Sequence, residues 1–131
     1  MKLFDFGLAK KMGPKSNSSN QLYKLTGGCG SCRFMAPEIA RYERYNESCD
    51  VYSFSILMWT ILTLKTPYVN YNIQEWYQNV VQGKERPGFI DEIEISESMK
   101  KLMNQCWDDD IFSRPSFDFI DDELRNKTCA W

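Results

Sequence analysis

Histidine is absent from the 131-residue sequence, and that absence narrows the chemistry open to the chain. Histidine is the most common general base in enzymes and the most common metal ligand in proteins. Positive charge is not in excess either, because 16 lysines and arginines stand against 18 aspartates and glutamates, for a net charge of -2. The composition therefore gives no support to a histidine-based active site, to nucleic-acid binding or to binding of an anionic membrane.

A membrane span and a disulfide framework are lacking as well. The most apolar stretch, residues 50–64, would form a helix about 22 Å long, whereas a bilayer core needs about 30 Å. Met1 is followed directly by Lys2 and a short strand-like run, which is not the pattern of a signal peptide. The five cysteines are odd in number and lack framework spacing, which is typical of a reducing compartment. We therefore expect a cytoplasmic location.

The stretch from Asp50 to Leu64 is the dominant feature of what the sequence does contain. Large apolar side chains occupy every phase of a helix there, Phe54, Leu57 and Trp59 among them. A helix that is apolar all round is buried, and a hydrophobic content of 43% is sufficient for a core. We predict a mainly α fold organised around this buried central helix, with Leu57 and Trp59 in the core.

Weaker signals predict the remaining elements. Pro67 prevents the central helix from continuing, and Gly83 is expected to be the C-cap of the helix that follows. Apolar spacing and helix-start residues then place, in chain order, a short buried strand over residues 2–4, a short helix from Pro37, and helices over residues 73–82, 96–107 and 115–124. No internal repeat or domain boundary is visible, so we expect one unit.

Residues 11–30 differ in composition from the rest of the chain and predict a loop. The turn pair Gly13-Pro14 and a polar run leave little to bury, so we expect this segment to be the least ordered. Its hydroxyl side chains are possible phosphorylation sites, namely Ser16, Ser18, Ser19, Tyr23 and Thr26. Cys29 and Cys32 form a single Cys-x-x-Cys pair, and without a second pair or a histidine we expect no zinc or redox role.

Five short motifs occur in a fixed order: Asp5-Phe6-Gly7, Ala36-Pro37-Glu38, Asp50-Val51-Tyr52-Ser53-Phe54, Cys106-Trp107 and Ser113-Arg114-Pro115-Ser116-Phe117. In order, spacing and residue type they resemble the second half of a protein kinase domain, from residue 2 to residue 125. The resemblance implies the C-terminal-lobe portion of the protein-kinase-like α+β fold. It makes residues 1–131 a partial kinase domain, with an activation segment over 5–38 and a helical subdomain over 39–125. Within the family, the motifs are most similar to the tyrosine-kinase-like Ser/Thr kinases.

The resemblance also implies roles for residues of the activation segment. In protein kinases the aspartate of the Asp-Phe-Gly motif holds Mg²⁺ against the nucleotide phosphates, which carries over to Asp5. The next residue, Phe6, packs to set the active or inactive state, and Gly7 completes the motif. Ser31 matches the hydroxyl in the loop that receives the substrate residue, where it contacts the catalytic aspartate. ATP and Mg²⁺ are thus implied as cofactors, and proteins as substrates.

Three further residues match structural positions of the family. Glu38 and Arg114 correspond to a buried ion pair that ties the activation segment to the last helices. Asp50 corresponds to the residue that hydrogen-bonds the backbone of the catalytic loop from the central helix. We therefore expect Glu38 and Arg114 to lie within salt-bridge distance. One departure is Ser55, which stands where the family commonly has glycine.

Several parts of a kinase have no counterpart among these 131 residues. They are the glycine-rich loop, the strand lysine with its helix glutamate, and the His-Arg-Asp motif with its later asparagine, which needs a histidine. We therefore expect the chain to be truncated just before the activation segment, and to be inactive alone for lack of the catalytic aspartate. Two hypotheses remain open: part of a working ATP-dependent Ser/Thr protein kinase, or a catalytically dead kinase-like module that docks other proteins.

Overall fold

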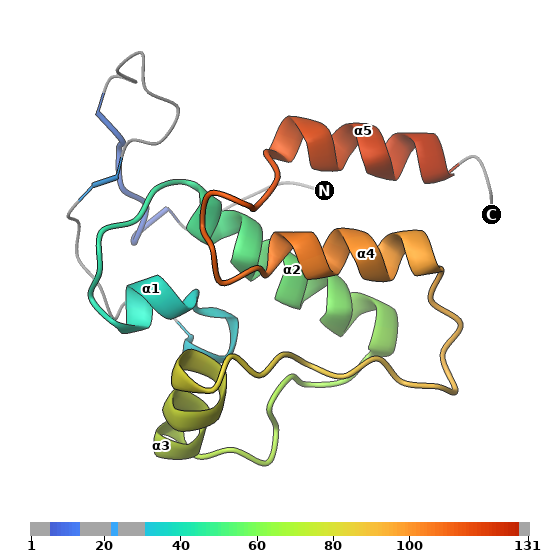
Figure 1. Ribbon diagram of the computed structural model, residues 1–131, viewed down its shortest axis with the longest axis horizontal. Coiled ribbons are helices and arrows are strands. Elements are labelled where there is room, and N and C mark those ends of the chain that lie inside the picture. The colour runs from blue at the N-terminus through green and yellow to red at the C-terminus, as the bar shows by residue number, and fades with distance from the viewer. Residues whose placement is uncertain (1–5, 14–21, 24–30, 129–131) are drawn as a thin grey trace.

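The computed structural model describes residues 6–13, 22–23 and 31–128, and within these ranges the chain is mainly helical (Figure 1). The elements in chain order are the 3₁₀ turn η1 (Cys32–Phe34), α1 (Pro37–Ala40), α2 (Ser48–Thr63), α3 (Ile73–Trp76), the π-helical η2 (Tyr77–Gln82), α4 (Glu97–Cys106) and α5 (Phe117–Thr128). The β pairing seen in the described ranges is a single antiparallel bridge between Tyr23 and Tyr45. The predicted mainly α fold is therefore confirmed.

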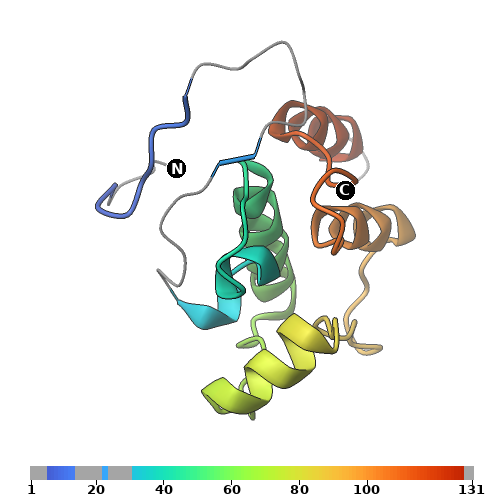
Figure 2. The ribbon, with the colours of Figure 1, turned by 60° about the vertical axis from the view of Figure 1, so that its left-hand side comes forward.

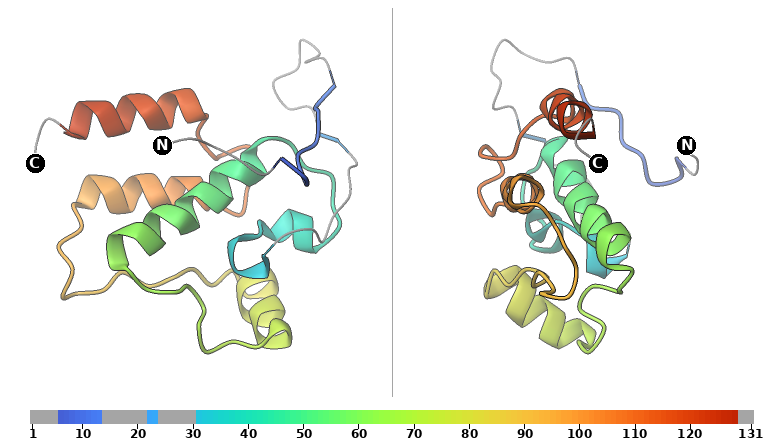
Figure 3. Two further views of the ribbon diagram at one scale, coloured as in Figure 1. Left: turned by 180° about the vertical axis from the view of Figure 1, so that it is seen from behind. Right: turned by 90° about the vertical axis from the view of Figure 1, so that its right-hand side faces the viewer.

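The longest helix, α2, crosses the middle of the molecule, and the other helices are arranged around it. Helix α4 packs directly on α2, and α5 lies beside α4 and runs antiparallel to it (Figures 1 and 3). The α3–η2 segment lies at the opposite end of the molecule from α5, next to α1 (Figure 2). This layout confirms that the chain is organised around the predicted central helix.

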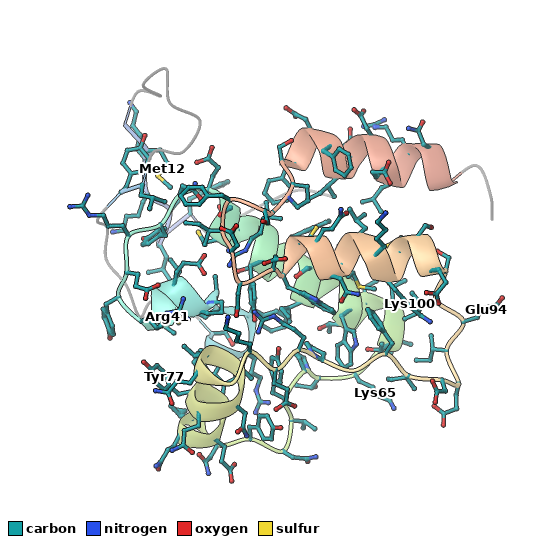
Figure 4. All side chains as sticks on the ribbon, viewed as in Figure 1. Met12, Arg41, Lys65, Tyr77, Glu94 and Lys100 are labelled. Carbon is teal, nitrogen blue, oxygen red and sulfur yellow. The ribbon has the colours of Figure 1, made fainter. Side chains whose placement is uncertain are left out.

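The main hydrophobic core lies between α2, α4 and α5. Ile56 from α2, Leu102 and Met103 from α4 and Ile120 from α5 are each at most 2% exposed. A second, smaller cluster consists of Trp76, Val80 and Val81, packed against the partly buried Met35 and Ala40 of the α1 region. Arg41, at the end of α1, donates to the carbonyl of Val81 at 3.2 Å and ties η2 to α1 (Figure 4).

The prediction that α2 is buried all round is wrong on one face. Trp59 is buried, at 6% exposed, but Leu57 is 39% exposed and Ile61 is 60% exposed. Leu57 and Ile61 are four residues apart and lie on one face of α2, and the C-cap residue Leu64 follows them at the end of the helix. Leu64 is also open to solvent, at 90%. The sequence of α2 is apolar on every face, so it could not indicate which face the described elements leave uncovered.

Helix α2 keeps its polar side chains inside the fold by bonding them to its own backbone. Ser55, Thr60 and Thr63 each donate to a carbonyl three or four residues back, at distances between 2.7 and 2.9 Å. Leu64 then ends the helix in the left-handed conformation (φ 54°), with its N–H bonded to the Thr60 carbonyl at 2.8 Å. The helix thus stops before Pro67.

The remaining helix boundaries lie within a few residues of the predicted ones. The helix expected over 73–82 is present but changes at Tyr77 from α to π geometry. It starts with a capping box between Asn72 and Glu75. Helix α4 is capped by Ser96, whose Oγ accepts the Met99 N–H at 3.3 Å. Helix α5 begins at Phe117 and runs further than expected.

Some predictions concern residues outside the ranges that the structure describes. The strand over residues 2–4 and most of the loop over residues 11–30 lie outside the described ranges. Within the described ranges, no helix is both long and apolar enough to cross a membrane.

Candidate functional site

A small cavity of about 200 Å³ opens where the start of the chain passes the N-terminal end of α2. Four of its lining residues, Leu8, Lys10, Met35 and Ala36, lie within the predicted activation segment. The others are Ile39 of α1, Tyr45, and Cys49, Asp50 and Ser53 of α2. The Asp-Phe-Gly motif enters this region through a turn in which the Ala9 N–H bonds the Phe6 carbonyl at 3.0 Å. The Phe6 ring is 69% exposed. Asp5 lies outside the described residues.

Asp50 presents its carboxylate to this cavity from the first turn of α2. The positive end of the helix dipole favours a negative charge at this position. Partial burial raises the pKa of Asp50, and the Cys49 thiol, 3.9 Å from Oδ1, lowers it by a smaller amount. Within the described ranges no other group bonds this carboxylate, which leaves acceptor capacity for a group that approaches the N-terminal end of α2.

The Cys49 thiol, although it lines the cavity, is not a reactive group. Burial raises the pKa of Cys49 to about 12, and the negative charges of Asp50 and Glu38 act in the same direction. The thiol is therefore protonated at neutral pH and a weak nucleophile. Cys32 is a free thiol, while Cys29 lies outside the described ranges. The described residues include no group of three or more potential metal ligands among histidine, cysteine, aspartate and glutamate.

Ser31 lies immediately before η1 and is exposed. The η1 turn is closed by the Phe34 N–H, which bonds the Ser31 carbonyl at 3.1 Å. Two side chains anchor this turn to the rest of the fold. Ser53 of α2 donates to the Phe34 carbonyl at 2.8 Å, and Arg33 donates to the carbonyls of Pro67 and Tyr68. Ser31 and η1 together form a loop, residues 31–34, which we call the Ser31 loop. It is held by the central helix on one side and by the α2–α3 connection on the other.

Glu38 and Arg114 form a bidentate, fully buried ion pair, so the predicted proximity is confirmed. Arg114 Nη1 lies 2.7 Å from Glu38 Oε1, and Nη2 lies 2.9 Å from Oε2. The side chains are 0% and 2% exposed, respectively. Arg114 also donates to the backbone carbonyls of Asp108 and Ser48, at 2.8 and 3.1 Å. The pair therefore joins α1, the start of α2 and the segment before α5, and its hydrogen bonds offset the cost of desolvating both charges.

Arg86 and Asp109 also belong to this region, although no sequence motif marks them. The Tyr52 ring is 1% exposed and has the guanidinium of Arg114 at 5.2 Å and that of Arg86 at 5.1 Å from its centroid. Arg86 in turn bonds the Trp107 carbonyl at 2.9 Å and forms an ion pair with Asp109. Tyr52 belongs to a motif that was noted in the sequence, but Arg86 and Asp109 lie in segments without a recognisable signal.

The proposed phosphorylation sites are mostly outside the described ranges, which exclude Ser16, Ser18, Ser19 and Thr26. Tyr23 is described. Its phenol donates to the Gly13 carbonyl at 3.1 Å, and its backbone exchanges hydrogen bonds of 2.8 and 3.0 Å with Tyr45. Phosphorylation of Tyr23 would remove that donor.

The buried Glu38–Arg114 pair, the central helix and the order of the flanking helices define a class of protein, the helical C-terminal lobe of protein kinases. Comparisons with known proteins agree. The family model described as "Protein tyrosine and serine/threonine kinase" matches residues 1–124. The chain therefore belongs to the protein kinase family, of which it represents a C-terminal portion.

Curated relatives carry kinase names. The serine/threonine-protein kinase VIK of Arabidopsis thaliana is 37% identical over 117 residues, which is 89% of this chain and 26% of that protein. The dual specificity protein kinases shkC and shkB of Dictyostelium discoideum are 36% and 39% identical, again over 89% of this chain, and over 22% and 17% of their own lengths. The chain thus spans about a quarter or less of the length of these relatives.

Proposed function

We propose that this chain supplies the substrate-side half of an ATP-dependent protein kinase that phosphorylates serine or threonine in proteins. The observation that carries the proposal is the Glu38–Arg114 pair, which joins the end of the activation segment to the segment before α5 in a buried, bidentate contact. The names of the relatives, which include serine/threonine-protein kinases and dual specificity kinases, support the same activity.

In this proposal each site residue has one task. Asp5 would hold Mg²⁺, which would neutralise the phosphate oxygens of ATP; this role rests on the Asp-Phe-Gly motif alone, because Asp5 lies outside the described residues. Ser31, on the anchored η1 loop, meets the catalytic aspartate and the substrate hydroxyl. Asp50 accepts hydrogen bonds from the catalytic-loop backbone, for which the free acceptor capacity of its carboxylate is suited. Phe6 and Gly7 set the conformation of the motif.

Phosphoryl transfer depends on holding the nucleotide and the substrate in line and on stabilising the transferred charge. The lysine, aspartate and asparagine that do this in kinases have no counterpart among the 131 residues. We therefore expect the 131-residue chain by itself to show no turnover and at best weak, Mg²⁺-dependent nucleotide binding. The alternative proposal is a catalytically dead kinase-like module. In that case the chain would bind other proteins as docking partners and not as substrates.

The test compares the 131-residue chain with a longer polypeptide that carries both kinase lobes and includes this sequence. Each is incubated with labelled ATP, Mg²⁺ and a generic protein substrate, and phosphoserine and phosphothreonine are measured. We expect transfer by the longer polypeptide only, and its loss in Asp5→Ala. The matched control Asp91→Ala, at an exposed acidic position of the α3–α4 connection, should retain activity.

Two results would contradict the proposal in different ways. Transfer by the 131-residue chain would show that the missing parts are dispensable. Inactivity of the longer polypeptide with all its motifs present would favour the binding-module alternative.

A further inference from the structure

The connection between α2 and α3, residues 64–72, has open space on both sides. A cavity of about 520 Å³ lies between this connection and residues 85–90, and another of about 550 Å³ lies between it and η1. Tyr68 and Tyr71 line both cavities and form the wall between them. Figure 4 shows Lys65 in the same connection, below α2. Tyr68 and Tyr71 also pack against the cluster of Trp76, Val80 and Val81, so this packing and specific hydrogen bonds together fix the position of the wall.

Tyr68 is held in a conformation that non-glycine residues rarely adopt. Its φ angle is 51°, in the left-handed region. Its carbonyl accepts hydrogen bonds from the Arg33 guanidinium and from the Tyr71 N–H, the latter at 3.1 Å. Such backbone strain persists only where the surroundings impose it. The direction of the Tyr68 carbonyl therefore depends on its neighbours, and that carbonyl is a partner of Arg33.

Tyr71 connects the wall to Glu85 through a solvent-exposed side-chain hydrogen bond. Its phenol oxygen lies 2.8 Å from each carboxylate oxygen of Glu85, and its ring stacks on Tyr68 with centroids 6.2 Å apart and an interplanar angle of 13°. Glu85 is itself fixed to η2, because its N–H bonds the Asn79 carbonyl at 2.9 Å. The Tyr71–Glu85 bond thus ties the wall to a packed helix. The same bond is the main reason why the pKa of Tyr71 is raised.

We propose that Tyr71 and Glu85 are positioning residues for the substrate-receiving loop. Their hydrogen bond holds the Tyr68 carbonyl where Arg33 binds it. Arg33 in turn lies within η1, two residues after Ser31. The role of the Ser31 loop rests on the proposed kinase function, but the mechanical connection from Glu85 to η1 does not. A purely local role for the Tyr71–Glu85 bond would leave η1 unchanged when the bond is removed.

The first test measures amide hydrogen exchange in the 131-residue chain, without any need for activity. The variants are Tyr71→Phe, which deletes the donor, and Glu85→Leu, which deletes the acceptor. Glu85→Gln is the conservative rescue, because its amide oxygen still accepts. Tyr77→Phe is the matched control, since Tyr77 is a half-buried tyrosine of the adjacent η2.

We expect the two deletion variants to exchange several-fold faster at the Tyr71 N–H and at the amides of Phe34 and Met35, which close the η1 turn. The factor should be modest because the bond between the phenol and the carboxylate is exposed. Glu85→Gln should fall between wild type and Glu85→Leu, and Tyr77→Phe should match wild type at these amides. Faster exchange at residue 71 with no change at 34 and 35 would overturn the proposal. If Glu85→Leu fails to fold, the nearly isosteric Tyr71→Phe decides.

The second test uses the longer polypeptide with both lobes. Tyr71→Phe should raise the KM for the protein substrate several-fold and leave the KM for ATP unchanged, because the affected loop lies on the substrate side. A change in both constants, or in neither, would contradict the positioning role. If the wild-type polypeptide is inactive, the proposed function fails, while the exchange experiment still decides whether the connection from Glu85 to η1 exists.

Discussion

Glu38 and Arg114 are almost completely removed from water, and this burial sets how much the pair contributes to the free energy of unfolding. We predict that Glu38→Gln, which leaves the Arg114 charge uncompensated, lowers the free energy of unfolding by about 3–5 kcal/mol. Urea denaturation followed by circular dichroism measures this loss.

The double variant Glu38→Leu with Arg114→Met is the informative control for this pair. Apolar replacement of both partners removes the two buried charges together, so it should recover a substantial part of the stability that the single change loses. A loss below about 1 kcal/mol for Glu38→Gln would instead be typical of a solvent-exposed pair.

Asp109 makes the stability of the chain depend on pH. Partial burial alone would raise the pKa of Asp109, but the hydrogen bonds and charges of Lys84 and Arg86 outweigh it and hold the pKa below its usual 3.8. A carboxyl with a lowered pKa contributes stability above its unfolded-state pKa, and that contribution is lost as the pH falls through the folded-state value.

The variant Asp109→Asn should therefore be less stable than wild type at pH 6, and the difference should shrink as the pH falls below about 4 and the wild-type carboxyl becomes protonated. Thermal unfolding at a series of pH values measures it. Asp91→Asn, at an exposed carboxyl of the α3–α4 connection, shows how much a change of charge alone contributes. A difference between Asp109→Asn and wild type that is constant down to pH 2 would contradict the ion-pair explanation.

At the scale of elements, the end of η2 shows why a glycine is needed there. The predicted C-cap at Gly83 is confirmed, but its φ is -81°, which any residue adopts. The requirement is space, because a Cβ at Gly83 would lie 2.7 Å from the Asn79 carbonyl oxygen and 3.2 Å from that of Gln78. The preceding π-helical turn brings these carbonyls close to the last residue.

We predict that Gly83→Ala lowers the free energy of unfolding by about 1–3 kcal/mol, as overpacking against backbone does. Gly88→Ala is the matched control, because a Cβ there meets nothing within 4 Å and should change stability little. Chemical denaturation of both variants provides the comparison. Equal stability of the two would indicate that η2 yields to the added methyl group.

At the scale of the whole molecule, one face of α2 leaves large apolar side chains open to solvent. Leu57, Ile61 and Leu64 present apolar surface to solvent on a helix whose opposite side forms the core. Exposed contiguous apolar surface of this kind promotes association. We predict that the 131-residue chain self-associates at micromolar concentrations and binds an apolar dye, and that Ile61→Lys reduces both without loss of stability.

Sedimentation velocity and dye fluorescence measure this effect. Gln74→Lys adds the same charge at an exposed position of α3 and should leave association unchanged. If Gln74→Lys lowers association as much as Ile61→Lys does, net charge rather than the apolar face is responsible.

Features that depend on local pattern and on the order of motifs could be predicted from the amino-acid sequence. The apolar run from Asp50 predicted the central helix, because a helix needs nothing beyond its own residues to establish its period. The resemblance of the motifs to those of protein kinases implied that Glu38 and Arg114, 76 positions apart, would pair, and they do.

Contacts between groups that no motif connects became visible only in the folded chain. Arg86 contacts Tyr52 and Asp109 because the segments that carry them pack together, and nothing in their spacing encodes that approach. Likewise, Leu57 and Trp59 are equally apolar in sequence, yet only Trp59 is buried. Burial and pairing across the chain are properties of the packed elements, since each side chain's environment is supplied by residues far from it in sequence.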